Sequence, residues 1–254
     1  MEFPNYKLEG RKALVTGGSS GIGQHVALSL ADAGCQVLVT GRNQKALEET
    51  AAQIQKMGQP AHFLVADLAD TKAAAAMARQ ADRILKGVDI LVNNAGLSIP
   101  ESALTATEEN WDITLNVNLK APMFISQQIA PGMIERGGGK IIMISSAAGF
   151  FGLPNHAAYG SSKGGMITLT KVLAVEWARY NVNVNGIAPT ATETPMVEKT
   201  WGTPDRRAII LSKIPAGRFG KPLDISGAVL FLASPASDFM NGETIMVDGG
   251  RAAQ

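Results

Sequence analysis

Two side chains with complementary acid–base chemistry are four positions apart in the sequence. Tyr159 and Lys163 begin a stretch of helical period that runs to Tyr180, so both are expected on one face of a helix. A free tyrosine, with a pKa of about 10, is a poor base at neutral pH. An ammonium about 4 Å away contributes about 4 kcal/mol at an effective dielectric constant of 20, but only about 1 kcal/mol in bulk water. The pair could therefore transfer protons in a sheltered cleft, whereas without other motifs two such residues would be ordinary core residues.

A glycine-rich turn near the start of the chain has the spacing of a phosphate-binding loop. Gly17, Gly21 and Gly23 lie between an apolar run at 12–16 and a segment of helical period at 21–33. Gly17 permits a tight turn, Gly21 lets the backbone approach a pyrophosphate, and Gly23 allows close helix–strand packing. The N-terminus of the following helix offers free N–H groups and a partial positive charge. The glycines alone would also fit a simple turn, but the strand–turn–helix context favours a dinucleotide site.

These residues need a scaffold, and the apolar pattern predicts an α/β fold. Short apolar runs alternate with helical segments, and the runs are almost uniformly apolar, as expected for a parallel sheet that helices cover on both faces. We therefore predict a single doubly wound domain over residues 1–254 with a seven-stranded parallel sheet. The seven runs are at 12–16, 36–40, 61–65, 88–92, 140–145, 182–187 and 243–247.

Composition excludes several classes of protein. The chain is 46% hydrophobic and 18% charged, which is enough for a large core and unlike disordered, collagen or coiled-coil sequences. A formal charge of +1 gives no general attraction to nucleic acid or to an anionic membrane. Cys35 is the single cysteine and the three histidines are isolated, so we expect neither a disulfide nor a metal site. No apolar stretch of about 18 residues suggests a membrane span, and Met1 to Lys12 does not resemble a signal peptide, so we expect a cytoplasmic location.

Four motifs, in order and at similar spacings, resemble those of the short-chain dehydrogenase/reductase family. They are the Gly17-x-x-x-Gly21-x-Gly23 turn, Asn93-Asn94-Ala95-Gly96, Tyr159-x-x-x-Lys163, and Val247-Asp248-Gly249-Gly250. The resemblance covers essentially the whole chain and is strongest to the 3-oxoacyl-(acyl carrier protein) reductase and sugar-alcohol dehydrogenase branch. It implies a Rossmann-like fold, a nicotinamide cofactor and a homotetramer that uses the helices around 108–135 and 157–180 and the last strand.

The resemblance also implies a role for each catalytic residue. Ser146, 13 residues before Tyr159, would hold the substrate oxygen, although Ser145 and Ser146 could also be plain turn residues. Tyr159 would be the general acid/base. Lys163 would hold the nicotinamide ribose and lower the pKa of Tyr159. Asn118 would orient water toward Lys163, with Asn116 as the alternative.

The residue after the second predicted strand bears on the choice of nucleotide. An acidic residue there would bind the adenosine ribose, but the chain has Gly41 followed by Arg42, whose guanidinium suits a phosphate monoester. This resembles the NADP-preferring branch, so NADP(H) is favoured and NAD(H) remains possible; Arg42 could instead begin a solvated helix. Asp67 and Leu68 resemble the pair that contacts adenine, and Asp67 could equally cap the helix near Thr71. The other residues expected at the cofactor are Ser19, Ser20, Ile22, Asn94, Ala95, Gly96, Pro189, Thr192 and Thr194.

An irregular, proline-rich segment follows the sixth predicted strand. Because ligands bind beyond the carboxyl ends of parallel strands, we expect it to form a lid at about 190–222. Met196 and Trp201 in this lid, together with His156, are candidate substrate contacts beside Ser146 and Tyr159. Arg206 and Arg207 are either a solvated helix face or contacts for an anionic substrate. Thr190 stands where the family commonly has glycine, which implies a locally different entry to the lid.

The function implied is interconversion of a ketone and a secondary alcohol by hydride transfer. Candidate substrates are 3-oxoacyl thioesters, sugar or polyol derivatives, and small cyclic ketones. One alternative is an NAD-dependent sugar or polyol dehydrogenase. Another is a non-catalytic dinucleotide-binding regulator, against which the joint presence of Ser146, Tyr159 and Lys163 argues.

Overall fold

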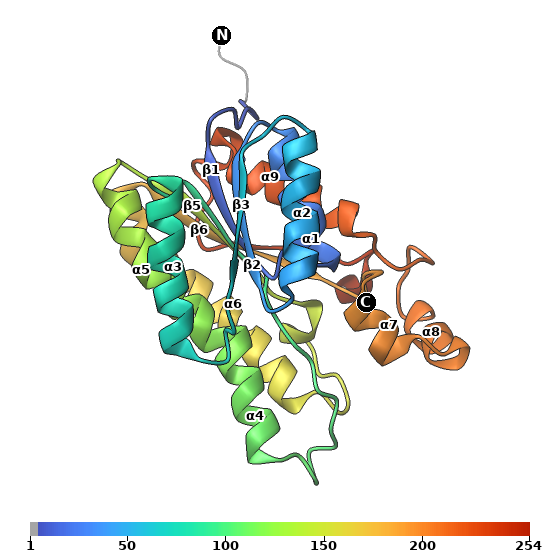
Figure 1. Ribbon diagram of the computed structural model, residues 1–254. Helices are drawn as coiled ribbons and strands as arrows, with labels where there is room; N and C mark the ends of the chain where they lie inside the picture. Colours follow the sequence, from blue (N-terminus) through green and yellow to red (C-terminus); the bar gives the residue numbers. More distant parts are fainter. Residues whose placement is uncertain (1–4) are drawn as a thin grey trace.

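The computed structural model describes residues 5–254 and contains a parallel sheet of seven strands (Figure 1). The strand order is β3-β2-β1-β4-β5-β6-β7. The order reverses between β1 and β4, and the crevice at the carboxyl ends of these two strands is where open α/β sheets bind ligands. Residues 1–4, the start of the segment expected not to be a signal peptide, lie outside the described residues. The strands are β1 Lys12–Thr16, β2 Gln36–Gly41, β3 Ala61–Val65, β4 Ile90–Asn93, β5 Gly139–Ile144, β6 Val182–Pro189 and β7 Thr244–Val247.

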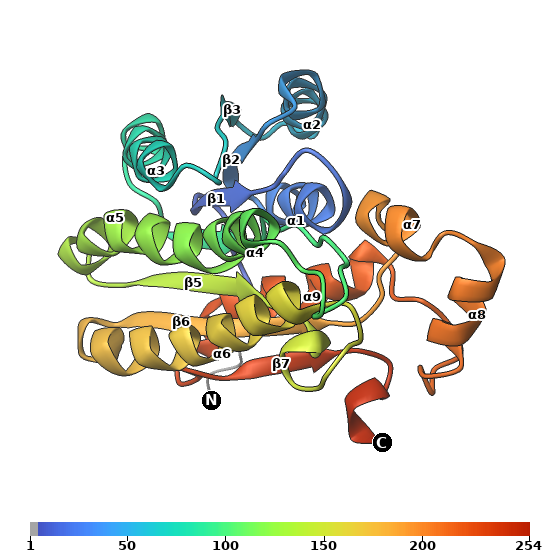
Figure 2. The same ribbon diagram turned by 90° about the horizontal axis from the view of Figure 1, so that it is seen from below.

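Helices cover both faces of the sheet, as the uniformly apolar strands predict (Figure 2). One face packs against α1 (Gly21–Asp32), α2 (Gln44–Lys56) and α9 (Pro222–Ala233). The other packs against α3 (Thr71–Leu85), α5 (Ala121–Glu135) and α6 (Ala157–Trp177). Successive strand residues supply the two cores alternately, so that Val15 belongs to the first and Leu14 to the second. The α/β doubly wound, Rossmann-like fold is therefore confirmed.

The strand boundaries differ from the prediction by a few residues, and the start of β4 shows why. The predicted run begins at Val88, but the strand begins at Ile90. Gly87 has a φ of +104°, and the N–H of Val88 donates to the Asp82 carboxylate at 2.9 Å. Val88 is an apolar residue buried in the core. Its backbone N–H is bonded to the Asp82 side chain instead of to a neighbouring strand, so it precedes the strand.

The helical stretch expected at 108–135 is interrupted. Helix α4 (Glu108–Leu115) is followed by a π-helical segment at Asn116–Lys120 before α5 begins. Pro122, in the first turn of α5, has no N–H to donate to the preceding turn, and a wider π turn accommodates that loss. The π segment buries Val117 and Asn118. No helix among the described residues is long and apolar enough to cross a membrane.

The segment after β6 is more ordered than its proline content suggested. It contains two short helices, α7 (Pro195–Trp201) and α8 (Pro204–Leu211), which project from the body of the molecule in Figure 2. The prediction of an irregular segment was wrong because prolines occupy the first turns of these helices. There proline is favourable, since its missing N–H would have no helical partner.

Candidate active site

The glycine-rich turn has the backbone conformations that its sequence predicts. Gly17 and Gly21 have φ values of +68° and +56°, which favour glycine. A Cβ on Gly23 would lie 2.2 Å from the carbonyl oxygen of Gly17, so only glycine lets α1 pack this closely. Ser20 precedes α1 but makes no side-chain capping bond, which leaves the first N–H groups of the helix free. This cradle fits the pyrophosphate of a dinucleotide.

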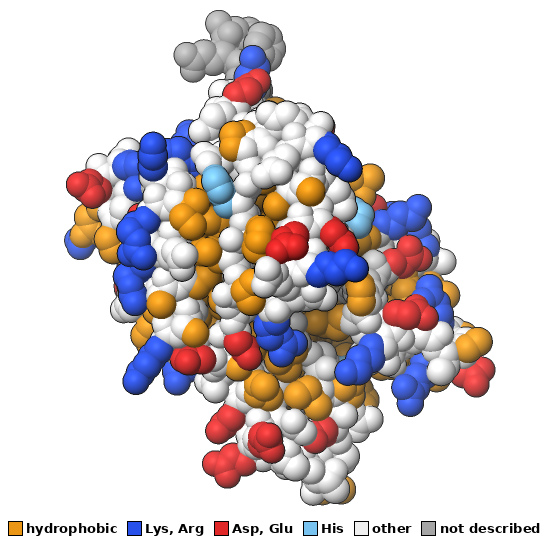
Figure 3. Space-filling view, in the orientation of Figure 1, with side chains coloured by type: hydrophobic (Ala, Val, Ile, Leu, Met, Phe, Trp, Pro, Cys, Tyr) orange, Lys and Arg blue, Asp and Glu red, His pale blue; other side chains and the backbone are white. Residues whose placement is uncertain are grey.

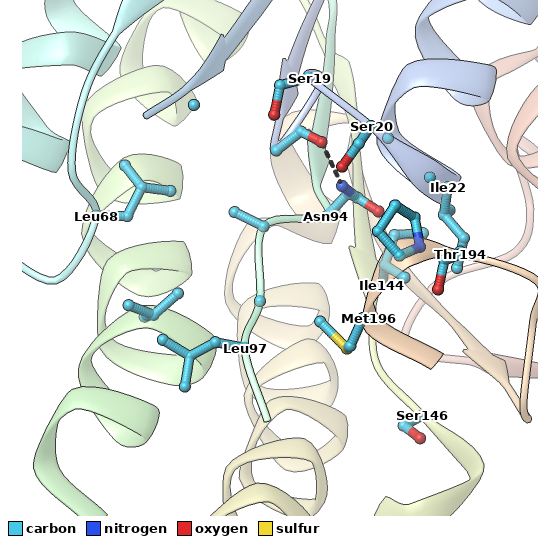
Figure 4. Close-up of a pocket in the computed structure, with 18 of the residues that line it drawn as sticks. Ser19, Ser20, Ile22, Leu68, Asn94, Leu97, Ile144, Ser146, Thr194 and Met196 are labelled. Atoms are coloured by element: carbon cyan, nitrogen blue, oxygen red, sulfur yellow. Dashed lines mark hydrogen bonds between the residues drawn. The ribbon is translucent and has the colours of Figure 1, made fainter. Parts of the chain in front are cut away.

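Thr16 and Asn94 brace this turn through hydrogen bonds, and Figure 4 shows Asn94 next to the turn. The hydroxyl oxygen of Thr16 accepts hydrogen bonds from the N–H groups of Asn94 and Ala95, both at 3.0 Å. In return the Asn94 amide donates to the carbonyl oxygens of Thr16 at 2.8 Å and Gly17 at 3.3 Å. The side chain of Asn94 therefore fixes the turn. Asn94 was expected at the cofactor, whereas Thr16 was not singled out from the sequence; its signal was its place at the carboxyl end of β1.

A cavity of about 320 Å³ opens at the carboxyl ends of the strands, beside this turn. Figure 3 shows charges of both signs on this side of the molecule, with acidic side chains gathered over α4. All the residues that the sequence analysis expected at the cofactor line this one cavity. They are Gly17, Ser19, Ser20, Gly21, Ile22, Gly23, Arg42, Asp67, Leu68, Asn94, Ala95, Gly96, Tyr159, Lys163, Pro189, Thr192 and Thr194.

The end of the cavity near β2 and β3 carries an exposed cation. Arg42 follows β2 and is exposed, while Gly41 lies close to the hydroxyl of Ser19. Asp67 accepts a hydrogen bond from the N–H of Ala69 at 3.0 Å and does not cap α3. That cap is Asp70, whose carboxylate accepts from the first N–H groups of the helix. The alternative role considered for Asp67 is therefore wrong.

The other end of the cavity brings together Ser146, Tyr159 and Lys163. Ser146 directly follows Ser145 at the end of β5, and the two other residues lie one turn apart on α6. The Nζ of Lys163 donates to the carbonyl oxygen of Ile144 at 2.8 Å and lies 5.9 Å from the centroid of the Tyr159 ring. The hydroxyl of Ser145 donates to the backbone carbonyl of Lys163, which is a structural role.

The pKa shifts in this group come mainly from burial. Burial raises the pKa of Tyr159, and a hydrogen bond with Ser146 opposes the rise. Burial lowers the pKa of Lys163 to about 8. The ammonium of Lys163 is bonded to the main-chain carbonyl of Ile144, and loss of water around the phenol is the main cause of the raised pKa of Tyr159. That Lys163 lowers the pKa of Tyr159 when a nicotinamide cofactor is bound stays a prediction.

Asn118 lies in the π segment with its side chain fully engaged. Its Oδ1 accepts from the N–H of Leu97, and its Nδ2 donates to the carbonyl of Leu97 and to the hydroxyl of Ser162, all at 2.9–3.0 Å. A Cβ on Gly96 would lie 3.3 Å from Oδ1 and 3.5 Å from the Nζ of Lys163, so Asn118 and Lys163 flank the same glycine. Its side chain ties the loop after β4 to α6, and an action on water stays a prediction. Neither Asn118 nor its alternative, Asn116, is among the residues that line the cavity.

A second cavity, of about 90 Å³, adjoins the first. The two share Ser146, Tyr159, Thr190, Met196 and Val197 as walls, and Figure 4 shows Met196 between the glycine-rich turn and Ser146. The five candidate substrate contacts, Ser146, His156, Tyr159, Met196 and Trp201, all line this smaller cavity.

Some residues of the smaller cavity escaped the sequence analysis. Phe151, Ser98 and Arg251 line it, although they come from different ends of the chain. Each follows a strand on its carboxyl side, which was the available signal. By contrast, Arg206 and Arg207 line neither cavity, and Arg207 pairs with Glu198 at 3.1 Å. Among residues 5–254 no group of three His, Cys, Asp or Glu side chains could hold a metal ion.

Comparison with known proteins supports this picture. Residues 17–252 match a family model described as enoyl-(acyl carrier protein) reductase. A 2-dehydro-3-deoxy-D-gluconate 5-dehydrogenase of Dickeya dadantii is 42% identical over 255 residues, which is 100% of both chains. A gluconate 5-dehydrogenase of Burkholderia cenocepacia, solved with NADP and tartrate, is 35% identical with a TM-score of 0.93, covering 98% of each chain. A short-chain type dehydrogenase/reductase of Mycobacterium marinum has the same identity, TM-score and coverage. The chain therefore belongs to the short-chain dehydrogenase/reductase family of oxidoreductases.

Proposed function

We propose that this protein uses NADP(H) to interconvert a ketone and a secondary alcohol on a sugar-derived hydroxy acid. One observation carries the proposal. Ser146 and Tyr159 form part of the wall between a cavity of about 320 Å³ and one of about 90 Å³. A group bound in the small cavity can therefore reach both hydroxyls and the end of a nucleotide bound in the large one.

The large cavity fits a dinucleotide that carries a 2′-phosphate. The uncapped start of α1 offers N–H donors to the pyrophosphate, and Arg42 offers its guanidinium to the phosphate monoester. Gly41 leaves no carboxylate at the end of β2 to repel that phosphate. The Burkholderia cenocepacia relative was solved with NADP, which supports this choice over NAD. When bound, NADP(H) would supply the hydride in reduction and accept it in oxidation.

The residues of the chain would handle the substrate oxygen and the proton. Ser146 and Tyr159 would hydrogen-bond the carbonyl oxygen, where negative charge develops during reduction. Because burial raises the pKa of Tyr159, its hydroxyl keeps a proton at neutral pH that it can donate to this oxygen. Lys163 would then compensate the charge of the phenolate. Asn118 would hold the loop beside Lys163 in place and, through water, return a proton.

We propose that the segment at 190–222 is a lid over the smaller cavity. Met196 and Trp201 of α7 form part of its wall, and a Cβ on Gly21 would lie 3.1 Å from the Cγ2 of Thr194, just before α7. The start of the segment therefore packs directly on the glycine-rich turn. Closure would exclude water and strengthen the electrostatic interactions at Tyr159.

The substrate class rests on the small cavity and on the relatives. The cavity has polar groups from Ser98, His156 and Thr200, which suit a polyhydroxylated chain better than a long acyl thioester. The Dickeya dadantii relative, 42% identical over its full length, is a 2-dehydro-3-deoxy-D-gluconate 5-dehydrogenase. A six-carbon sugar acid is therefore favoured over a small cyclic ketone.

We further propose a cytoplasmic homotetramer. Val172 and Val175 on α6 are 46% and 82% exposed, and an apolar surface of this kind on a long helix fits a helix-to-helix interface between subunits. Cys35 is a free, buried thiol, which fits a reducing compartment. Light scattering that shows a monomer at micromolar concentration would contradict the tetramer.

A substrate panel followed at the nicotinamide absorbance tests the function. We expect turnover of D-gluconate with NADP+ in preference to NAD+, and little with a 3-oxoacyl thioester or a cyclic ketone. Tyr159→Phe should lower kcat by about 10²- to 10⁴-fold, with NADPH binding retained by fluorescence titration. Tyr180→Phe, at a surface residue bonded to Arg179, is the matched control. Unchanged turnover in Tyr159→Phe would reject the catalytic assignment, and NADPH binding without turnover of any substrate would favour the regulator.

A further inference from the structure

We propose that Arg251 binds the carboxylate of the substrate and so selects a hydroxy acid over a neutral polyol. The inference rests on the proposed function, because it assumes that the substrate occupies the smaller cavity beside Ser146 and Tyr159. It adds the residue that determines which class of sugar derivative is accepted.

The backbone of Arg251 is fixed by the turn that follows β7. Gly249 and Gly250 have φ values of +63° and +87°, and they turn the chain into the short helix Arg251–Ala253. The Asp248 carboxylate accepts hydrogen bonds from the N–H of Gly250 at 2.9 Å and of Ala252 at 2.7 Å. Each carboxylate oxygen of Asp248 therefore accepts a backbone hydrogen bond. These bonds fix the backbone of Arg251 independently of its side chain.

The side chain of Arg251 is held at the wall of the smaller cavity by two weak contacts. Its Cζ lies 4.9 Å from the centroid of the Phe151 ring, and Nη1 donates to the hydroxyl oxygen of Thr190 at 3.4 Å. Thr190 is the residue that stands where the family commonly has glycine, and it supplies an oxygen that glycine lacks. The threonine that replaces the usual glycine at position 190 thus contacts Arg251.

The charge of Arg251 is partly buried and forms no ion pair with the described part of the chain. Burial lowers the pKa of its guanidinium, against the opposing effect of Asp248. Across residues 5–254, no carboxylate forms an ion pair with Arg251, whereas Arg136 and Arg218 each have one acidic partner and Arg207 has two. A partly desolvated cation is costly unless an anion compensates it. An anionic substrate in the adjoining cavity would do so.

A second polar group of the same cavity also lacks a partner. The hydroxyl oxygen of Ser98 is buried and makes no hydrogen bond within the described part of the chain. Buried hydroxyls are normally hydrogen-bonded, so this one fits a ligand that brings its own polar groups. A guanidinium for a carboxylate and a free hydroxyl for a substrate hydroxyl match a polyhydroxylated acid. Arg251 places one guanidinium at the wall of this cavity of about 90 Å³. A planar guanidinium can bind a carboxylate through two parallel hydrogen bonds.

The test compares D-gluconate with D-sorbitol, which share a carbon chain and differ at the carboxylate. We expect Arg251→Gln to raise KM for gluconate by about 10- to 100-fold, the range for a lost charge-assisted hydrogen bond, and to lower the gluconate-to-sorbitol ratio of kcat/KM by a similar factor. Arg251→Lys keeps a charge near Phe151 but loses the paired donors, so it should lose part of this selectivity. The matched control is Arg83→Gln, at an exposed arginine of α3. Thermal unfolding and NADPH titration report whether each variant is folded.

The outcomes separate this inference from the proposed function. If the wild-type protein oxidises sorbitol but not gluconate, the proposed substrate class fails before any variant is made. If gluconate is the substrate and both Arg251 variants keep the wild-type selectivity, only the role of Arg251 is overturned. A wild-type preference for D-sorbitol 6-phosphate over gluconate that Arg251→Gln removes would overturn the carboxylate assignment in favour of a phosphate ester.

Discussion

The imidazole of His156 stacks on the indole of Trp201, with ring centroids 5.9 Å apart and an interplanar angle of 8°. His156 immediately precedes α6, and Trp201 is the last residue of α7, so the stack joins the candidate lid to the helix that carries Tyr159. The imidazole and the Tyr159 ring also form a T-shaped pair, with centroids 6.1 Å apart and an interplanar angle of 75°. The Nδ1 of His156 lies 2.8 Å from the carbonyl oxygen of Pro154, which holds the ring in this orientation. The imidazole of His156 therefore contacts both the candidate lid, at Trp201, and the phenol ring of Tyr159.

Removing the stack should weaken substrate binding. We expect Trp201→Ala to raise KM by about 2- to 10-fold, because a stacked aromatic pair contributes about 0.5–1.5 kcal/mol beyond the area that it buries. Steady-state kinetics with D-gluconate would measure the change. Trp111→Ala is the control, since Trp111 lies on α4, is 40% exposed and lines neither cavity. An unchanged KM in Trp201→Ala would mean that the stack does not hold the lid over the substrate.

The guanidinium of Arg42 should distinguish NADPH from NADH. Arg42→Gln is expected to raise the Kd for NADPH by about 10- to 100-fold through the loss of a charge-assisted hydrogen bond. The Kd for NADH should stay nearly constant, because NADH lacks the 2′-phosphate. Fluorescence titration measures both constants, with Lys45→Gln as a control on the exposed face of α2. A similar loss of affinity for NADH would show that Arg42 does not bind the 2′-phosphate specifically.

Reduction should decline in alkali as Lys163 loses its proton. Burial lowers the pKa of Lys163 to about 8, so its ammonium is the minor form above that pH. Burial raises the pKa of Tyr159, so the phenol still carries the proton to be donated there. We therefore expect kcat/KM for ketone reduction to be level near pH 7 and to fall above about pH 8. Lys163→Arg, if active, should extend the level region, since a guanidinium stays charged. A profile that is level through pH 10 would contradict a required ammonium at this position.

Two glycine-to-alanine changes in helices should have opposite effects on stability. At Gly23 a Cβ would lie 2.2 Å from the carbonyl oxygen of Gly17, so Gly23→Ala should cost about 1–3 kcal/mol, the usual range for overpacking. At Gly227, in the exposed face of α9, a Cβ would meet nothing within 4 Å, so Gly227→Ala should stabilise the protein by up to about 1 kcal/mol. Urea unfolding measures both free energies. Equal stability of the two variants would contradict the close approach of α1 to the turn.

Local sequence was enough to predict the scaffold and one face of the site. Strands buried on both sides read as continuous apolar runs, so all seven were found, although the start of β4 was misplaced where a side chain bonds the backbone of Val88. The turn at Gly17 and the pairing of Tyr159 with Lys163 on one helix face depend on neighbours in sequence, and sequence reports these well. The prolines after β6 were misinterpreted because proline breaks a helix in its interior but begins one at its first turn.

Only the tertiary structure decided which distant residues share a cavity and in which direction the pKa values of Tyr159 and Lys163 are shifted. Ser98, His156, Trp201 and Arg251 meet because parallel strands end at the same edge of one sheet, and no spacing along the chain encodes that meeting. The low pKa of Lys163 and the high pKa of Tyr159 arise from burial by many remote side chains. Desolvation depends on everything packed around a group, which is why the sequence predicted that Tyr159 and Lys163 share a helix face but could not determine the direction in which each pKa is shifted.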